Sequence, residues 1–84
     1  MQAYILLNCQ PTSEKDIIAE IRKLPQVLEV NGIMGIYDIL VKVGEENPDE
    51  VDLAIAKVRG VKGIDRTYTM PVIYGQGGTI DEEG

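Results

Sequence analysis

Hydrophobic and polar positions along the chain predict four β-strands and two α-helices. Residues 3–9 are mostly apolar and include a β-branched side chain, and residues 36–43 alternate between an apolar and a mixed face. Residues 27–34 and 64–74 are predicted to form the other two strands. On the apolar face of the third strand, the alternation places Tyr37, Ile39, Val41 and Val43.

The predicted helices have recognisable ends. The first is predicted to begin at Ser13, as its N-cap, and to stop before Pro25, because proline disfavours helical backbone in the residue before it. The second is predicted to begin at Asn47, with Pro48 at its first helical position, and to end at Gly60. Each helix carries its apolar residues on one stripe, so both are expected to pack on a sheet.

The two halves of the chain repeat one pattern. A shift of 34 residues aligns Ile5 with Ile39 and Ile17 with Val51, without a gap. Each half reads strand, helix, strand, so the whole chain is predicted to be β-α-β-β-α-β, the ferredoxin-like α+β arrangement. Right-handed crossovers then place both helices on one face of a four-stranded antiparallel sheet with strand order 4-1-3-2. Pro71 fits this order, since proline is tolerated in an edge strand.

The other face of the predicted sheet has no helix to cover it. The alternation places Tyr4, Leu6 and Leu40 on this face, with the two leucines at its centre. Single exposed apolar residues are common, but two central leucines on adjacent strands of a domain with a small core favour a buried interface. Because symmetric dimers dominate among small oligomers, we expect a homodimer that forms through the open sheet face.

Composition narrows the possible functions. The chain has 84 residues, a formal net charge of −6, one cysteine and no histidine. We expect one domain over residues 1–74 and a flexible, glycine-rich acidic tail over residues 75–84. The acidic balance disfavours direct nucleic-acid binding, and the residues indicate no catalytic site, cofactor or metal. With no signal peptide and no membrane-spanning segment in view, a cytoplasmic protein without membrane contact is expected.

The connection between the second and third strands holds the main candidates for ligand binding. Gly35 is expected to supply the positive φ of a hairpin, and Asp38 is an acidic residue in a strand, where acids are depleted. A carboxylate at the rim of an interface needs a partner, which a ligand ammonium group would provide. Backbone N–H groups near Gly35 could bind a ligand carboxylate. Thr67 and Thr69 share one face of the last strand and could line such a pocket, although β-propensity alone also explains them.

Taken together, these residues resemble a known family. The strand Ala3–Cys9, the segment Leu24-Pro25-x-Val27-x-x-Val30, the hairpin Gly35-x-Tyr37-Asp38 and the late Thr67-x-Thr69 are similar to the effector-binding (RAM) domain of the Lrp/AsnC regulators. The resemblance covers about residues 3–74. It implies dimers that pack through their sheets and assemble further into octamers or other rings, with small effectors, usually amino acids, bound between subunits.

The resemblance also implies where the ligand binds. Contacts are expected at Gly35, Tyr37 and Asp38, and also at Thr67 and Thr69. Family members often have threonine before the hairpin glycine, whereas this chain has Met34, which implies a more apolar pocket wall.

Full-length family members carry an N-terminal helix-turn-helix domain, whereas here the first strand begins at residue 3. We therefore expect a stand-alone RAM protein that senses an effector without touching DNA and acts through a full-length Lrp/AsnC regulator or an enzyme. Two other functions stay open. One is a structural assembly module without a ligand, and the other is an enzyme of the dimeric ferredoxin-like monooxygenase type, ranked lower because the chain has no His, Trp or Phe.

Overall fold

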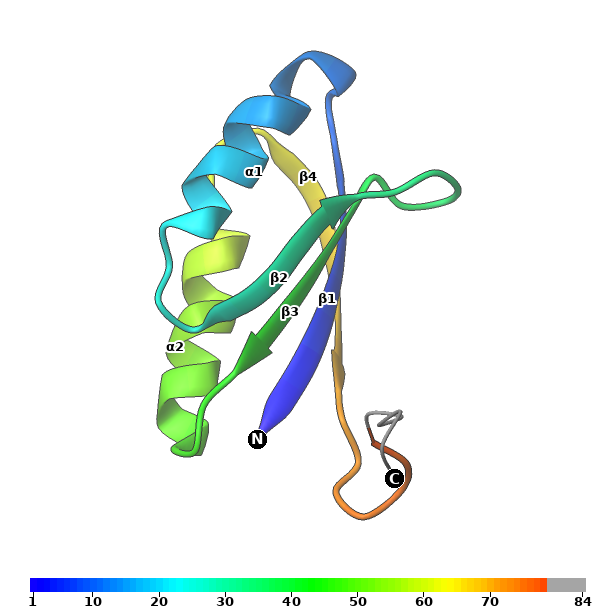
Figure 1. Ribbon diagram of the computed structural model, residues 1–84. Coiled ribbons are helices and arrows are strands. Elements are labelled where there is room, and N and C mark those ends of the chain that lie inside the picture. The colour runs from blue at the N-terminus through cyan, green and yellow to red at the C-terminus, as the bar shows by residue number, and fades with distance from the viewer. Residues whose placement is uncertain (79–84) are drawn as a thin grey trace.

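The chain forms a four-stranded antiparallel sheet with two helices on one side of it (Figure 1). This computed structural model describes residues 1–78, so the predicted tail over residues 75–84 lies mostly outside the described residues. The elements in chain order are β1 (Gln2–Cys9), a 3-10 turn (Pro11–Ser13), α1 (Glu14–Arg22), β2 (Val27–Gly32), β3 (Ile39–Gly44), α2 (Pro48–Arg59) and β4 (Ile64–Pro71).

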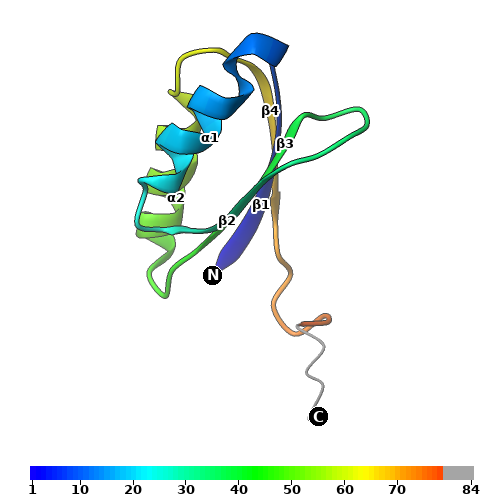
Figure 2. The ribbon, with the colours of Figure 1, turned by 45° about the horizontal axis from the view of Figure 1, so that its top comes forward.

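The predicted topology is confirmed. The strand order is β2-β3-β1-β4, so β4 is an edge strand and Pro71 lies at its end. Three strand limits were wrong, because β2 ends at Gly32, β3 begins only at Ile39, and β4 ends at Pro71. Residues 33–38 instead leave the sheet as a hairpin connection, which projects away from the helices in both ribbon views (Figure 2).

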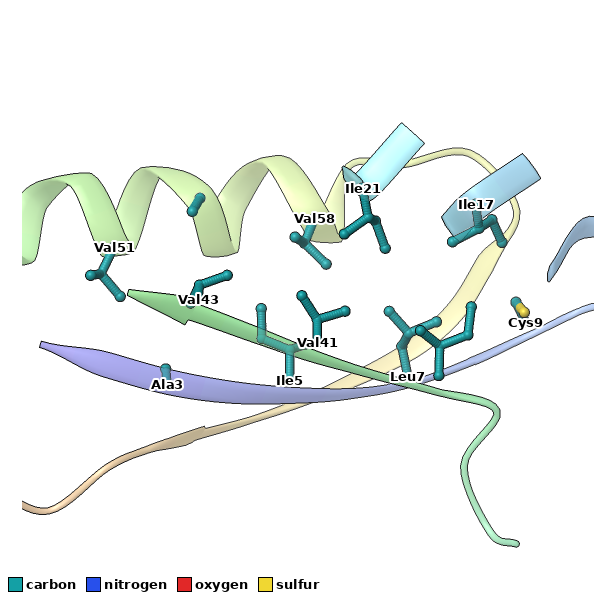
Figure 3. Packing of buried hydrophobic residues seen from close by; sticks show 12 residues of the cluster. Ala3, Ile5, Leu7, Cys9, Ile17, Ile21, Val41, Val43, Val51 and Val58 are labelled. Atoms are coloured by element: carbon teal, nitrogen blue, oxygen red, sulfur yellow. The ribbon is translucent and has the colours of Figure 1, made fainter. Parts of the chain in front are cut away.

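Strict alternation along the two central strands produces the core. Ile5 and Leu7 of β1 and their neighbours on β3 are fully buried beneath the helices (Figure 3). The repeat is visible in this core, because Ile17 of α1 and Val51 of α2, which are 34 positions apart, are both buried. The buried apolar cluster consists of Ala3, Ile5, Leu7, Cys9, Ile17, Ile21, Ile39, Val41, Val43, Val51, Ala54 and Val58.

The prediction that Tyr37 lies on the core face of the sheet was wrong. Alternation assigned it to the same face as Ile39, yet Tyr37 precedes β3 and its ring stacks on Tyr68. Tyr68 pairs with Leu6 and therefore lies on the face without helices. The hairpin connection breaks the period-2 pattern before β3 begins, so the alternation cannot be extended back through it.

The two helix starts differ in how they are capped. The side-chain oxygen of Asn47 accepts a 2.9 Å hydrogen bond from the backbone N–H of Asp49, as an N-cap should. Ser13 also occupies an N-cap position, but its side chain makes no capping bond. The preceding 3-10 turn already holds Ser13 at φ −98° and ψ −8°, close to helical values, rather than in the extended conformation usual for a cap. The prediction of Ser13 as the first N-cap is therefore correct in position and wrong in mechanism.

This difference generates a matched stability test. Asn47→Ala should lower the free energy of unfolding by about 1 kcal/mol, because it leaves one N-terminal N–H of α2 without its acceptor. Ser13→Ala should change it by less than about 0.5 kcal/mol, since no capping bond is lost. Urea denaturation followed by circular dichroism measures both values, and equal losses in the two variants would contradict this account.

Candidate functional site

The face of the sheet opposite the helices carries the predicted interface residues. Leu6 of β1 pairs with Leu40 of β3 on one side and with Tyr68 of β4 on the other, which makes an apolar row across the centre. Tyr4 lies in the next row, where its ring faces the Lys42 ammonium at 5.6 Å. We call this surface the open face; it comprises Tyr4, Leu6, Asn8, Glu29, Asn31, Leu40, Lys42, Arg66, Tyr68 and Met70. The predicted placement of Tyr4, Leu6 and Leu40 is confirmed, whereas their role in a dimer stays a prediction.

The hairpin connection lies at one end of the open face. Gly35 has φ +138°, a conformation that other L-residues rarely adopt, so its predicted role in the turn is confirmed. The neighbouring side chains of Met34 and Ile36 are 100% and 87% exposed. Within residues 1–78, the backbone N–H groups of residues 34–37 have no hydrogen-bond partner. The hairpin therefore presents two apolar side chains and a set of free donors away from the helices.

Asp38 anchors this hairpin to the sheet. Its backbone N–H donates to the Leu7 carbonyl at 2.9 Å, and its carbonyl accepts from the Ile33 N–H at 2.8 Å. Its carboxylate Oδ2 accepts the backbone N–H of Cys9 at 3.0 Å and the Asn8 side-chain amide at 3.4 Å. The same amide donates to the Ile36 carbonyl at 2.8 Å. Asn8 thus ties the hairpin to the carboxylate, a function that the sequence left unassigned.

Two aromatic rings border the same end of the open face. The rings of Tyr37 and Tyr68 are nearly parallel, with an interplanar angle of 10° and centroids 6.5 Å apart. Their side chains come from the hairpin and from β4, on opposite sides of β1 in the sheet. The sequence does not predict this pair, because no local pattern links residues on non-adjacent strands.

The two threonines lie elsewhere. Thr67 pairs with Leu7 and Thr69 with Ile5, so both point to the helix side of the sheet, at its β4 edge. Asp38 lies instead beside Asn8 on the opposite side. Within one chain, the predicted ligand residues Gly35, Tyr37 and Asp38 come together at the hairpin, and Thr67 and Thr69 stay apart from them.

Cys9 connects the site to the core. The side chain is 7% exposed and belongs to the buried apolar cluster. Burial raises the pKa of the Cys9 thiol, and the nearby Asp38 carboxylate raises that pKa further. A thiol in this setting stays protonated and unreactive near neutral pH.

Comparison with known proteins identifies the family. The model of the Lrp/AsnC ligand binding domain matches residues 2–75. The chain belongs to this family. An uncharacterized HTH-type transcriptional regulator of Pyrococcus furiosus is 39% identical over 72 residues, which cover 81% of this chain and 48% of that protein. A homocitrate synthase of Sulfurisphaera tokodaii is 35% identical over 74 residues, which cover 87% of this chain and 16% of that enzyme.

Solved structures share the fold of this Lrp/AsnC domain. The crystal structure of FFRP-DM1 has a TM-score of 0.79 and 30% sequence identity, and the match covers 86% of this chain and 97% of that one. A transcriptional regulator of Neisseria meningitidis in complex with L-Met has a TM-score of 0.75 at 20% identity, with 93% of this chain and 53% of that one covered. The chain spans about half the length of the curated regulators it matches.

Two features are absent within residues 1–78. None of the helices in this range is long and apolar enough to cross a membrane. The same range contains no group of three or more His, Cys, Asp or Glu side chains placed to hold a metal ion.

The environment of Cys9 predicts how fast its thiol is alkylated at a given pH. Alkylation of the folded domain by iodoacetamide should need a higher pH than alkylation of glutathione, because burial and the Asp38 charge both disfavour the thiolate. Asp38→Asn removes the charge but keeps an oxygen that can accept the Cys9 N–H, so it should move the rate profile toward lower pH. The matched control is Asp52→Asn, at an exposed position of α2.

The raised pKa of the Cys9 thiol also makes the stability of the domain depend on pH. The thiol has a higher pKa in the folded chain than in the unfolded chain. Its contribution to stability is therefore fully present below the unfolded pKa and is lost as the pH rises through the folded pKa. If the alkylation rate of the wild-type domain depends on pH as that of glutathione does, the pKa of Cys9 is not raised and both predictions, for alkylation and for stability, are wrong.

Proposed function

We propose that this domain is a non-catalytic sensor that binds a small effector, an amino acid, at the hairpin end of the open face and between subunits. Effector binding then regulates transcription or metabolism by shifting the equilibrium between assembly states. Such a shift requires only that the effector bind one assembly more tightly than the other. Whether the domain acts without a DNA-binding domain of its own stays a prediction.

The main support for this proposal is that one oxygen of the Asp38 carboxylate is held in place and the other has no partner. Both of its hydrogen bonds go to Oδ2, so within residues 1–78 the second oxygen, Oδ1, has no partner. The half-buried carboxylate is held in place by the backbone of β1 and needs no rearrangement to accept an ammonium group. The free N–H groups of residues 34–37 lie in the same hairpin and suit a carboxylate. Fixed acceptors and donors side by side match the two charged ends of an amino acid.

Relatives support the proposed class of effector and the regulatory role. The Neisseria meningitidis regulator of the same fold was crystallised with L-Met, an amino acid with an apolar side chain. In this chain, the exposed Met34 and Ile36 would provide apolar contacts for such a side chain. The family segment occurs both in HTH-type regulators and in a homocitrate synthase, which suits a sensor that can be combined with different effector functions.

The open face supports assembly as the second part of the proposal. Its central row of Leu6, Leu40 and Tyr68 would be buried if a second copy packed its own open face against it. Covering apolar surface contributes about 25 cal/mol for each Å² removed from water. Higher oligomers, such as an octamer or another ring, would bring further surfaces together. Thr67 and Thr69 could then reach an effector only where the β4 edge of one subunit meets the hairpin of another.

A screen of the twenty standard amino acids by thermal shift tests effector binding. At about 100 times its Kd, an effector that binds only the folded state adds about 2.7 kcal/mol, or roughly 10–20 °C in Tm for a domain of this size. Asp38→Asn should weaken binding about 10- to 100-fold, because it removes the charged partner of the ammonium group. Asp52→Asn, on α2, should leave binding unchanged. If no amino acid raises the Tm of the wild-type domain, the amino-acid proposal is wrong and a ligand-free assembly module is favoured.

The mass of the protein in solution tests assembly. Leu40→Glu should reduce the dimer or larger oligomer to the monomer, because it would bury a carboxylate in an apolar interface. The matched control, Leu53→Glu, changes a leucine that is 44% exposed on α2 and should keep the wild-type mass. Light scattering after size exclusion measures both. A monomeric wild-type protein at high micromolar concentration, or an oligomeric Leu40→Glu variant, would contradict assembly through the open face.

A further inference from the structure

The edge of the sheet that β2 forms is free to pair with another strand. β2 is the outermost strand on the side away from β4 (Figure 1). The Ile33 N–H donates to the Asp38 carbonyl, toward the β3 side. Neighbouring residues of an antiparallel strand point their N–H and C=O groups in opposite directions, so those of Val30 and Gly32 point outward. Residues 1–78 supply no strand beyond β2, which leaves these groups available to an added backbone.

A hollow of about 270 Å³ follows this edge. Its walls are Arg22 of α1 and the four consecutive residues 27–30 of β2. Successive side chains of a strand point to opposite faces, so a hollow that touches four residues in a row lies along the edge of the strand rather than on one face. Arg22 is exposed and forms no ion pair within the described part of the chain. The edge therefore has space for a second backbone, with an unpaired guanidinium beside it.

One stripe of α1 runs along the same edge. Glu14, Ile18 and Arg22 are four residues apart and share one side of the helix. A β-carbon on Gly32 would lie 2.7 Å from the Glu14 carboxylate and 3.9 Å from Cδ1 of Ile18, so both side chains lie against the end of β2. Arg22 lies beside the start of β2. The edge is thus accompanied by an anion, an apolar side chain and a cation at intervals of about 6 Å, because a helix rises 1.5 Å per residue.

We propose that β2 binds an extended segment of a partner protein, added antiparallel to it, with the pattern Lys/Arg-x-apolar-x-Asp/Glu. Alternate residues of a strand share one face and are about 6.6 Å apart, which matches the interval along α1. In this orientation the cation meets Glu14, the apolar side chain meets Ile18 and the carboxylate meets Arg22. Main-chain hydrogen bonds to Val30 and Gly32 provide affinity, and the charge pattern provides specificity. The surface would let the sensor contact the protein that it regulates.

A second copy of this chain fits the same edge poorly. Glu14 and Ile18 lie against Gly32, so α1 lies directly over the edge strand. Paired strands are about 4.8 Å apart, whereas packed helices need about 8–10 Å between their axes. Two copies paired through β2 would bring their α1 helices into the same space, and an extended segment brings no helix. The edge also points sideways out of the sheet, so a partner could bind there while a second copy covers the open face.

The test uses the capped peptide acetyl-Thr-Lys-Thr-Val-Thr-Glu-Thr-amide and NMR titration of the isotopically labelled full chain. The backbone N–H signals of Val30 and Gly32 should move most, because these groups gain hydrogen-bond partners. A short peptide of this kind should bind with a Kd in the high micromolar to millimolar range. Exchanging its lysine and glutamate should weaken binding at least about threefold, since like charges then meet at Glu14 and Arg22.

N-methylated peptides separate strand pairing from simple charge attraction. Val30 and Gly32 pair with Val41 and Ile39, which are buried beneath the helices, so both lie on the helix side of the register. Peptide residues opposite them direct their side chains toward α1 and their N–H groups toward β2. An N-methyl group on the peptide valine removes an edge hydrogen bond and should weaken binding at least about tenfold. The same group on a neighbouring threonine points to solvent and should leave binding nearly unchanged.

A charge reversal tests the pairing with Arg22. Arg22→Glu should weaken binding of the peptide about three- to tenfold, and a peptide with lysine in place of its glutamate should restore the affinity. A purely structural effect of the substitution would not be rescued in this way. Arg59→Glu, which makes the same change in the last turn of α2, should leave the affinity for both peptides unchanged.

Several outcomes would overturn the inference. They are no movement of the Val30 and Gly32 signals at millimolar peptide, equal or tighter binding of the exchanged peptide, and equal effects of the two N-methyl positions. Movement confined to signals of the open face would place the peptide elsewhere. If Arg22→Glu changes the mass of the protein in solution without peptide, the edge pairs with a second copy and the inference is again wrong. Each of these results leaves the proposed effector site standing, because the amino-acid screen tests that site separately.

Discussion

The pairing of β1 between β3 and β4 is the constraint on which the rest of the structure depends. Successive side chains of a strand point to opposite faces, so the burial of Ile5 and Leu7 beneath the helices forces Leu6 onto the open face. The register with β3 and β4 then sets Leu6 beside Leu40 and Tyr68. A shift of one residue would expose the core and bury the polar end of the open face, and the burial of the core therefore specifies the register strongly. The core and the proposed site are two consequences of one pairing.

Asp38 links those two consequences physically. It ends the hairpin and begins the pairing with β1, through its bonds to the backbone of Leu7 and Cys9. The strand backbone holds one carboxylate oxygen and leaves the other available. The same charge lies near the buried Cys9 thiol and helps to raise its pKa. The residue that ends the hairpin is thereby also the charged group that we propose binds the effector.

Segments similar to this domain occur in proteins of different overall design. The segment makes up 48% of an HTH-type regulator and 16% of a homocitrate synthase. The helices of the domain bury one stripe in its core, whereas the free N–H groups of residues 34–37 and two of the most exposed apolar side chains, Met34 and Ile36, belong to the hairpin. This division suits a module whose sensing surface is separate from the face that stabilises it. Because the hairpin residues and the threonines of β4 lie on opposite sides of the sheet, one effector could contact both groups of predicted ligand residues only where two subunits meet.

The sequence alone determined the β-α-β-β-α-β order, the core positions, the positive φ at Gly35 and the apolar centre of the open face, because each of these follows from local periodicity or from one residue's backbone preference. Only the tertiary structure decided that Tyr37 turns toward Tyr68, that Asn8 ties the hairpin to Asp38, and that Thr67 and Thr69 face away from that carboxylate. These features depend on register across three strands and on how the hairpin leaves the sheet. No local pattern encodes them, because they arise from contacts between residues that are 28 or more positions apart.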